Sequence, residues 1–304
     1  MKKIGISVGR LTELYGVDRM LELVAEIGAN CIDFPLNKED YRKKSSIYSH
    51  SDEEIIEHYK RIGERARECG VEISQTHGRI RSYINDPTED AAALENARRD
   101  IIATKALGAP VTVMHGPTTC RLGADAPAEL MHDLAFSFFD SALAFAAEQG
   151  VMLATETFGD ATGLGVCDFF GNTDEFIKLY DRVMRESEHS AYFTACVDTG
   201  HSNKAMRYND NPTPANVIRA CGGRVSCLHL NDNDSLTDQH KPPMTGIIDW
   251  EDVLCALDEI GYEGVYNMEL ALKCFGEGLE LETAAFAIKI MRNMLERHYA
   301  GSEA

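Results

Sequence analysis

Eight short stretches rich in apolar and β-branched residues recur along the chain, and each is followed by a longer amphipathic stretch. The apolar stretches cover residues 3–9, 31–37, 71–78, 110–116, 151–159, 192–201, 225–232 and 264–270. Most are continuous apolar runs of strand length, which is typical of parallel strands buried on both faces. This alternation limits the folds open to the chain more than any other feature of the sequence.

The amphipathic stretches have the patterns of helices. Residues 16–29 repeat apolar side chains at spacings of three and four. Residues 51–70 begin with Ser and acidic residues and end in Gly, which are helix start and stop signals. Further helices are expected over 96–108, 126–150, 172–184, 213–221, 249–260 and 280–299. Eight strand–helix units in 304 residues predict an α/β fold, a single (β/α)8 barrel over residues 1–304.

A doubly wound open sheet is the alternative architecture. No G-x-G-x-x-G follows the first expected strand, which removes the usual dinucleotide-binding form of that fold. No linker-like change of composition divides the chain, so one domain is expected. The loops at 38–50, 117–126, 160–171 and 232–248 exceed a minimal turn, and long loops on one barrel face usually build or cover a site.

Charge and composition exclude several classes of protein. A formal net charge of −19 argues against a nucleic-acid partner and disfavours an anionic membrane surface. No apolar run approaches the roughly eighteen residues that a membrane span needs, and the first residues do not resemble a signal peptide. The nine cysteines are scattered without a C-x-x-C pair, which favours a reduced, cytoplasmic protein.

Polar side chains stand near the carboxyl ends of the expected strands, where barrels of this kind carry their active sites. They are His77, His115, Glu156, Asp198, His201, His229 and Glu269. The last four strands contribute three carboxylates and one imidazole, from Glu156, Asp198, His229 and Glu269. Carboxylates crowded in a low-dielectric site repel one another. A divalent cation is the simplest compensation, and an oxygen-rich set with one nitrogen suits Mn²⁺, Mg²⁺ or Co²⁺.

Each of these residues also has a structural interpretation when it is taken alone. A single histidine at a strand end is usually a hydrogen-bonded core or surface residue. Asp198 could cap the next helix, and Glu269 could pair with a basic side chain. Four such residues on four successive strands favour the metal site.

Several motifs resemble the xylose-isomerase-like sugar isomerase and epimerase barrels. They are "TETFG", "VDTGH", "LHLNDND" with "DQH" and "IDW", and "NMEL". The resemblance implies that Glu156, Asp198, His229 and Glu269 bind one divalent metal, with manganese expected first and magnesium, cobalt or zinc as alternatives. It also implies that Glu156 and Glu269 form an acid/base pair beside a substrate carbonyl. His77, His115, His201, Asp238 and His240 would contact hydroxyl or carbonyl groups of a small sugar substrate.

The resemblance leaves the reaction open. Ketose 3-epimerases of this family carry an Arg shortly after the metal-binding His, and residues 230–240 contain none. Lys241 would replace it only in part, because the planar guanidinium is lost. Another branch, the C-glycoside deglycosidases, eliminates an aglycone from a glycoside oxidised at its 3-position, and works with a small partner subunit. A homo-oligomer is equally open.

Two further alternatives belong to other functional classes. Asp238 and His240, with His77, His115 and His201, complete a pattern that resembles endonuclease IV, a related barrel with three zinc ions that cleaves phosphodiesters. The acidic charge of the chain opposes a DNA substrate. A non-catalytic sugar-binding barrel is the other alternative, although both glutamates are present.

A few residues outside this set have simpler expected roles. Asp249 is expected to cap the helix over 249–260, and Trp250 is expected to pack. Arg79 and Arg81 follow His77 and are expected to be solvated loop charges, with contact to a substrate phosphate or carboxylate as the alternative.

Overall fold

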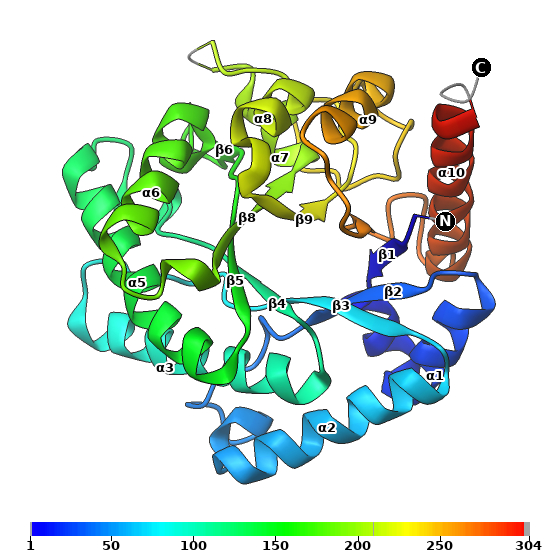
Figure 1. The fold of residues 1–304 in the computed structure, drawn as a ribbon, viewed down its shortest axis with the longest axis horizontal. Helices are drawn as coiled ribbons and strands as arrows, with labels where there is room; N and C mark the ends of the chain where they lie inside the picture. The colour runs from blue at the N-terminus through cyan, green and yellow to red at the C-terminus, as the bar shows by residue number, and fades with distance from the viewer. Residues whose placement is uncertain (1, 209, 301–304) are drawn as a thin grey trace.

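A computed structural model describes residues 2–208 and 210–300, and Figure 1 shows a ring of strands surrounded by helices. The strands of the ring are β1 (Ile4–Ser7), β2 (Cys31–Pro35), β3 (Glu72–His77), β4 (Val111–Met114), β5 (Met152–Glu156), β8 (Phe193–Asp198), β9 (Val225–His229) and β10 (Tyr266–Met268). They pair in parallel in the order β10-β1-β2-β3-β4-β5-β8-β9. A parallel bridge between Leu230 and Met268 joins the two ends of this order. The predicted (β/α)8 barrel is confirmed.

The helices lie outside the strands and alternate with them along the chain (Figure 1). The longer ones are α1 (Gly9–Glu26), α2 (Asp52–Glu68), α3 (Pro87–Leu107), α5 (Ala128–Gln149), α6 (Thr173–Glu186), α8 (Pro214–Cys221), α9 (Trp250–Glu259) and α10 (Glu280–Ala300). Two short helices, α4 (Thr119–Leu122) and α7 (Thr199–Ala205), lie in the connections after β4 and β8. Each longer helix overlaps one of the eight predicted helices.

The helix ends follow the local sequence. Ser51 and Glu54 form a reciprocal capping box at the start of α2. Asp249 accepts a hydrogen bond from the backbone N–H of Asp252 and caps α9, as predicted. Trp250 is 5% exposed and donates its indole N–H to Asp232 at 2.8 Å, so it packs in the structure as expected.

Some boundaries differ from the predicted ones. Helix α3 begins at Pro87 rather than at residue 96, because Asp86 caps it with two backbone hydrogen bonds and proline suits the first helical position. Helix α1 begins at Gly9, but Gly16 has a φ of 73° and interrupts it where the predicted helix began. The expected loop at 160–171 contains a small hairpin, β6 (Asp160–Ala161) and β7 (Val166–Cys167).

Helix α5 is long and apolar enough to cross a membrane by length and composition alone. It lies between α3 and α6 on the outside of the ring (Figure 1). Phe138, Phe139 and Leu143 on this helix are fully buried. The pattern is that of a core helix packed on a barrel strand.

The apolar core has two parts. The larger part fills the space between the strands and the helices. A smaller cluster joins side chains of four neighbouring strands: Val111, Val113, Ala154, Cys196 and Cys227. Successive side chains of a strand point to opposite faces. Residues two positions beyond this cluster therefore point to the same inner face, and they are His115, Glu156, Asp198 and His229.

Candidate metal centre

The four predicted metal ligands lie together at the carboxyl ends of the strands. Glu156, Asp198 and His229 are the last residues of β5, β8 and β9, and their side chains are fully buried. Glu269 follows β10 and has a side chain 21% exposed. One ligand atom from each of the four lies within 4.8 Å of those of the others. Strands from the second half of the chain thus bring three carboxylates and one imidazole to one point.

The two glutamates approach the same nitrogen. Nδ1 of His229 lies 3.1 Å from Oε1 of Glu156 and 3.4 Å from Oε2 of Glu269. Within residues 2–208 and 210–300, neither this nitrogen nor either carboxylate oxygen of Glu156 has a hydrogen-bond partner, although all three atoms are buried. A buried polar group without a partner costs about 1–3 kcal/mol, and more if it is charged. A divalent cation would satisfy all three atoms, so the donor set fits such an ion.

Asp33 is a part of this centre that the sequence analysis missed. Its Oδ2 lies 3.0 Å from Nε2 of His229 and accepts a hydrogen bond from Nε2 of Gln75 at 3.2 Å. A carboxylate on one ring nitrogen of a histidine fixes the tautomer and leaves the other nitrogen for a metal. The clue in the sequence is an acidic residue inside the apolar stretch 31–37, where β2 is buried.

Asp198 has two sets of contacts. Its Oδ1 accepts a hydrogen bond from the backbone N–H of His201 at 2.6 Å. Asp198 therefore caps α7, which is the structural role expected for this residue taken alone. Its Oδ2 accepts a hydrogen bond from Nδ2 of Asn231 at 2.8 Å. Burial raises the pKa of this carboxyl above its usual value. The helix cap therefore holds the carboxylate in the cluster at an energetic cost that a bound cation would reduce.

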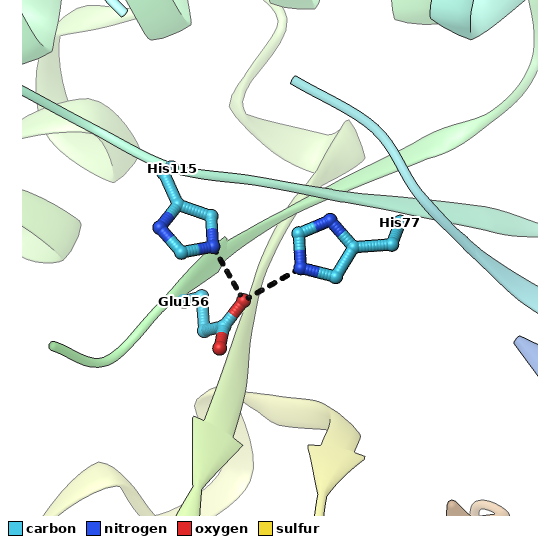
Figure 2. A group of neighbouring side chains, drawn as sticks. All are labelled: His77, His115 and Glu156. Carbon is cyan, nitrogen blue, oxygen red and sulfur yellow. Dashed lines mark ion pairs between the residues drawn. The ribbon is translucent and has the colours of Figure 1, made fainter. Parts of the chain in front are cut away.

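Two further histidines point at Glu156 from the neighbouring strands β3 and β4 (Figure 2). Nε2 of His115 lies 2.9 Å from Oε2 of Glu156, and Nε2 of His77 lies 3.7 Å from the same oxygen. The ring of His77 stacks on that of His229, with centroids 5.3 Å apart. His77, His115 and Glu156 form a second group with the spacing of metal ligands.

The long loop after β9 carries the remaining predicted site residues to the same place. Oδ2 of Asp238 lies 3.3 Å from Nε2 of His240 and 3.8 Å from Nε2 of His201. Nδ1 of His201 lies 3.4 Å from Oε1 of Glu156. Lys204, which no sequence motif indicated, is 4% exposed and lies 3.6 Å from Asp238. The structure thus collects all nine predicted site residues into one cluster.

The imidazoles control the protonation of the carboxylates. Burial opposes ionisation of Glu156, but His229 and His115 outweigh it and hold the pKa of Glu156 well below its usual value. Desolvation also opposes ionisation of Glu269, but His229 and His77 lower its pKa. Both glutamates are therefore ionised near neutral pH, as a metal ligand or a general base must be.

The prediction that Arg79 is a solvated loop charge is wrong. It is 5% exposed and donates hydrogen bonds to both carboxylate oxygens of Asp100, at 2.9 and 3.0 Å. Tyr48 donates its hydroxyl to the same carboxylate at 2.8 Å. Asp100 lies on α3 and Tyr48 lies after β2, so the sequence pattern could not show that they enclose Arg79. Arg81 is exposed, as expected.

One curated protein matches part of the chain. It is the uncharacterized protein y4fM of Sinorhizobium fredii, 28% identical over 180 residues. The match covers 59% of this chain and about half of that protein, 52% of its length.

Solved structures match nearly the whole chain and show the same fold. A D-tagatose 3-epimerase-like protein has a TM-score of 0.74 at 21% identity, covering 99% of this chain and 100% of its own. D-psicose 3-epimerase from Clostridium cellulolyticum has a TM-score of 0.70 at 17% identity, covering 97% and 99%. The 3-keto-D-glucoside 4-epimerase YcjR from E. coli has a TM-score of 0.68 at 13% identity, covering 95% and 100%.

A family model matches most of the chain. Residues 21–293 match the family described as the xylose isomerase-like TIM barrel, and this range includes all nine clustered residues. The chain therefore belongs to the xylose isomerase-like TIM barrel family.

Proposed function

We propose that this protein is a divalent-metal-dependent enzyme that epimerises or isomerises a sugar derivative. The reaction would begin with removal of a proton from a carbon next to a carbonyl group. Membership of the family and the fold shared with sugar epimerases support this proposal. The observation that carries it is the approach of two ionised glutamates, the buried Glu156 and the partly exposed Glu269, to one nitrogen of His229.

The residues of the cluster have separate roles in this proposal. Glu156, Asp198, His229 and Glu269 would hold the ion, which would act as a Lewis acid and stabilise negative charge on the substrate oxygens. Glu269 would take the proton from the substrate carbon, and Glu156 would return one, or the reverse. His77, His115, His201 and His240 surround the two carboxylates and would hydrogen-bond the hydroxyl groups of the sugar.

The test of this reaction is exchange with solvent. The manganese-loaded protein is incubated in D₂O with D-tagatose, D-psicose and a 3-keto-glucoside, and deuterium at carbon is measured by mass spectrometry and NMR. We expect deuterium at the carbon beside the carbonyl of at least one sugar. Loss of a general acid or base slows a reaction by about 10²–10⁴-fold, so the Glu269→Gln variant should show that loss.

A matched control separates catalysis from a change of charge. Glu263 is an exposed glutamate that precedes β10, at the opposite end of the barrel from Glu269. The Glu263→Gln variant should exchange at the wild-type rate. Full exchange in Glu269→Gln would remove the proposed role. Sugar binding by the metal-loaded wild type without exchange into any of the three sugars would favour a non-catalytic binding barrel.

A phosphodiesterase is the second candidate, because the cluster contains four overlapping or adjacent ligand groups instead of one. They are His77 with His115 and Glu156, His77 with His229 and Glu269, His201 with Asp238 and His240, and Glu156 with Asp198, His229 and Glu269. Elemental analysis of protein purified without chelators distinguishes the candidates. About one manganese, magnesium or cobalt ion per chain supports the sugar reaction. About three zinc ions per chain would favour phosphodiester cleavage.

A further inference from the structure

A cavity lies beside the metal cluster, on the side of β2, β3 and β4. Its volume is about 730 Å³, and its lining comes from three segments after strands, within residues 37–43, 79–84 and 116–121, and from Glu89, Ala93 and Asn96 of α3. Two of these segments continue directly from the cluster, because Gly116 follows His115 and Arg79 lies two residues after His77. A pocket of about 300–1,000 Å³ suits a ligand larger than one sugar ring.

Positive charge is concentrated in this cavity, although the whole chain has a net charge of −19. Six basic side chains line it, against three acidic ones. The acidic residues have partners: Arg42 pairs with Asp40 and Glu89, and Ser46 donates to Glu39. Among the basic residues, Arg79 is already bound to Asp100.

Three of the cations have no partner among the described residues. The structure gives no ion pair and no side-chain hydrogen bond to Lys43, Arg81 or Arg121 within residues 2–208 and 210–300. They come from three different loops, one after each of β2, β3 and β4. Unpaired cations from three separate connections around one cavity favour a negatively charged ligand.

The wall of the cavity also contains a buried group without a partner. Ser82 is 7% exposed, and its Oγ has no hydrogen-bond partner among the described residues. A buried hydroxyl without a hydrogen bond is unusual in a folded protein. Ile80, Ile84 and Pro117 line the same space and give it apolar surface. The lining therefore combines an unsatisfied hydroxyl, free cations and apolar side chains.

We propose that this cavity binds an anionic oxygen group, a phosphate or a carboxylate, on a part of the substrate that extends beyond the sugar ring. Lys43, Arg81 and Arg121 neutralise the charge, and the guanidinium groups offer paired donors to its oxygens. Ser82 adds a hydrogen bond. The anion site stands on the lining residues, whereas its assignment to the substrate rests on the proposed function. The preferred substrate is then an anionic glycoside or a phosphorylated sugar, and neutral sugars such as D-tagatose react more slowly.

The test is calorimetric titration of the manganese-loaded protein with three small probes. Phenyl phosphate and benzoate carry the two anionic groups on an apolar ring, and benzyl alcohol is their neutral counterpart. We expect at least one anion to bind at least tenfold more tightly than benzyl alcohol. The comparison of phenyl phosphate with benzoate identifies which anion the cavity prefers.

Two triple variants locate the binding. Lys43→Gln/Arg81→Gln/Arg121→Gln removes the unpaired cations, which are exposed and make no contact that the fold needs. This variant should bind the preferred anion at least tenfold more weakly. The control, Lys44→Gln/Lys60→Gln/Arg61→Gln, removes the same charge from exposed residues outside the cavity and should bind as the wild type does. Ser82→Ala should weaken binding about threefold or more.

Several results would overturn the anion site. If the Lys43→Gln/Arg81→Gln/Arg121→Gln variant binds the anion as tightly as the wild type, the anion binds at the metal instead. If the control variant loses as much affinity as this variant, the loss comes from the change in net charge and not from the cavity. If benzyl alcohol binds as tightly as the anions, the cavity does not select for a negative charge. These titrations require no turnover. Intact anion binding without deuterium exchange would therefore contradict the proposed function alone.

Discussion

At the scale of the residue, the centre depends on the hydrogen bonds that orient each candidate metal ligand. His229 is fully buried, and Asp33 occupies its Nε2, so that Nδ1 faces Glu156 and Glu269. Asp198 is held in a similar way, by the N-terminus of α7 and by Asn231. Groups fixed by such contacts lose little freedom when they bind a metal ion.

Asp33→Asn tests this support. The carboxamide presents an N–H or a weaker acceptor to Nε2 of His229, which disturbs the ring orientation and its tautomer. Loss of such a partner typically reduces metal affinity about 10–100-fold. We expect a rise of that size in the Kd for manganese, measured by competition with a fluorescent chelator. The circular dichroism spectrum should not change. An unaltered Kd would show that Asp33 only fills space in β2.

At the scale of the element, strand parity brings the site residues together. On β4, β5, β8 and β9 the apolar side chains inside the barrel are followed two residues later by the polar ones. The connections after the strands surround these side chains. Short elements such as α4 and the 3-10 helix Phe169–Gly171 lie in the loops that cover the carboxyl ends.

Asp168 joins two of these loop elements, and its burial makes them sensitive to pH. Its carboxylate accepts the backbone N–H groups of Thr119 and Phe170 at 2.9 and 3.3 Å. Burial raises its pKa to about 6. The folded protein therefore binds this proton more readily than the unfolded chain, and the contribution of Asp168 to stability falls as pH rises from about 4 to 6. A shift of about two units corresponds to about 3 kcal/mol.

The Asp168→Asn variant has no such titration. Its free energy of unfolding, relative to that of the wild type, should improve by up to about 3 kcal/mol between pH 4 and pH 7. Urea denaturation at the two pH values measures the difference. Asp125→Asn, at an exposed position in the neighbouring loop, controls for the loss of one carboxylate. A difference between Asp168→Asn and the wild type that stays constant with pH would contradict the argument.

At the scale of the whole molecule, a buried ion pair connects segments far apart in the sequence. Arg79, from the loop after β3, pairs with Asp100 of α3 and donates to the backbone oxygens of Leu36 and Glu39 after β2. Removing one partner of a buried pair leaves an uncompensated charge, which costs about 3–5 kcal/mol. We expect Asp100→Ala to lower the free energy of unfolding by that amount.

An exposed pair gives the comparison. Asp181 and Arg224 are 2.8 Å apart with side chains 49% and 32% exposed, and a pair of this kind contributes about 0–1 kcal/mol. Asp181→Ala should therefore change the urea midpoint much less than Asp100→Ala. Replacing both buried partners, as Asp100→Ala/Arg79→Met, should recover part of the lost stability. Equal losses in Asp100→Ala and Asp181→Ala would show that burial of the Arg79 pair adds nothing.

The sequence by itself determined the architecture. Strand and helix patterns are local, because apolar periodicity and cap residues act over a few positions. All eight strands and all eight longer helices therefore overlap the stretches that the patterns predicted, although the starts of α1 and α3 differ. The sequence also predicted that the polar residues at the strand ends form one site, because the fold brings the carboxyl ends of all strands to one face. That rule placed Glu156, Asp198, His229 and Glu269 in one predicted group before any distance was known.

Only the tertiary structure decided which groups touch. Asp33 supports His229 across a sequence separation of 196 residues, and Asp100 encloses an arginine expected in solvent. The unpaired cations of the cavity come from three connections that are separated widely in the sequence. Such contacts depend on distances across the barrel, and the local pattern of a single chain does not encode which partner a charge will meet. Which charges form ion pairs, which side chains are buried and which cations stay unpaired are therefore properties of the folded molecule.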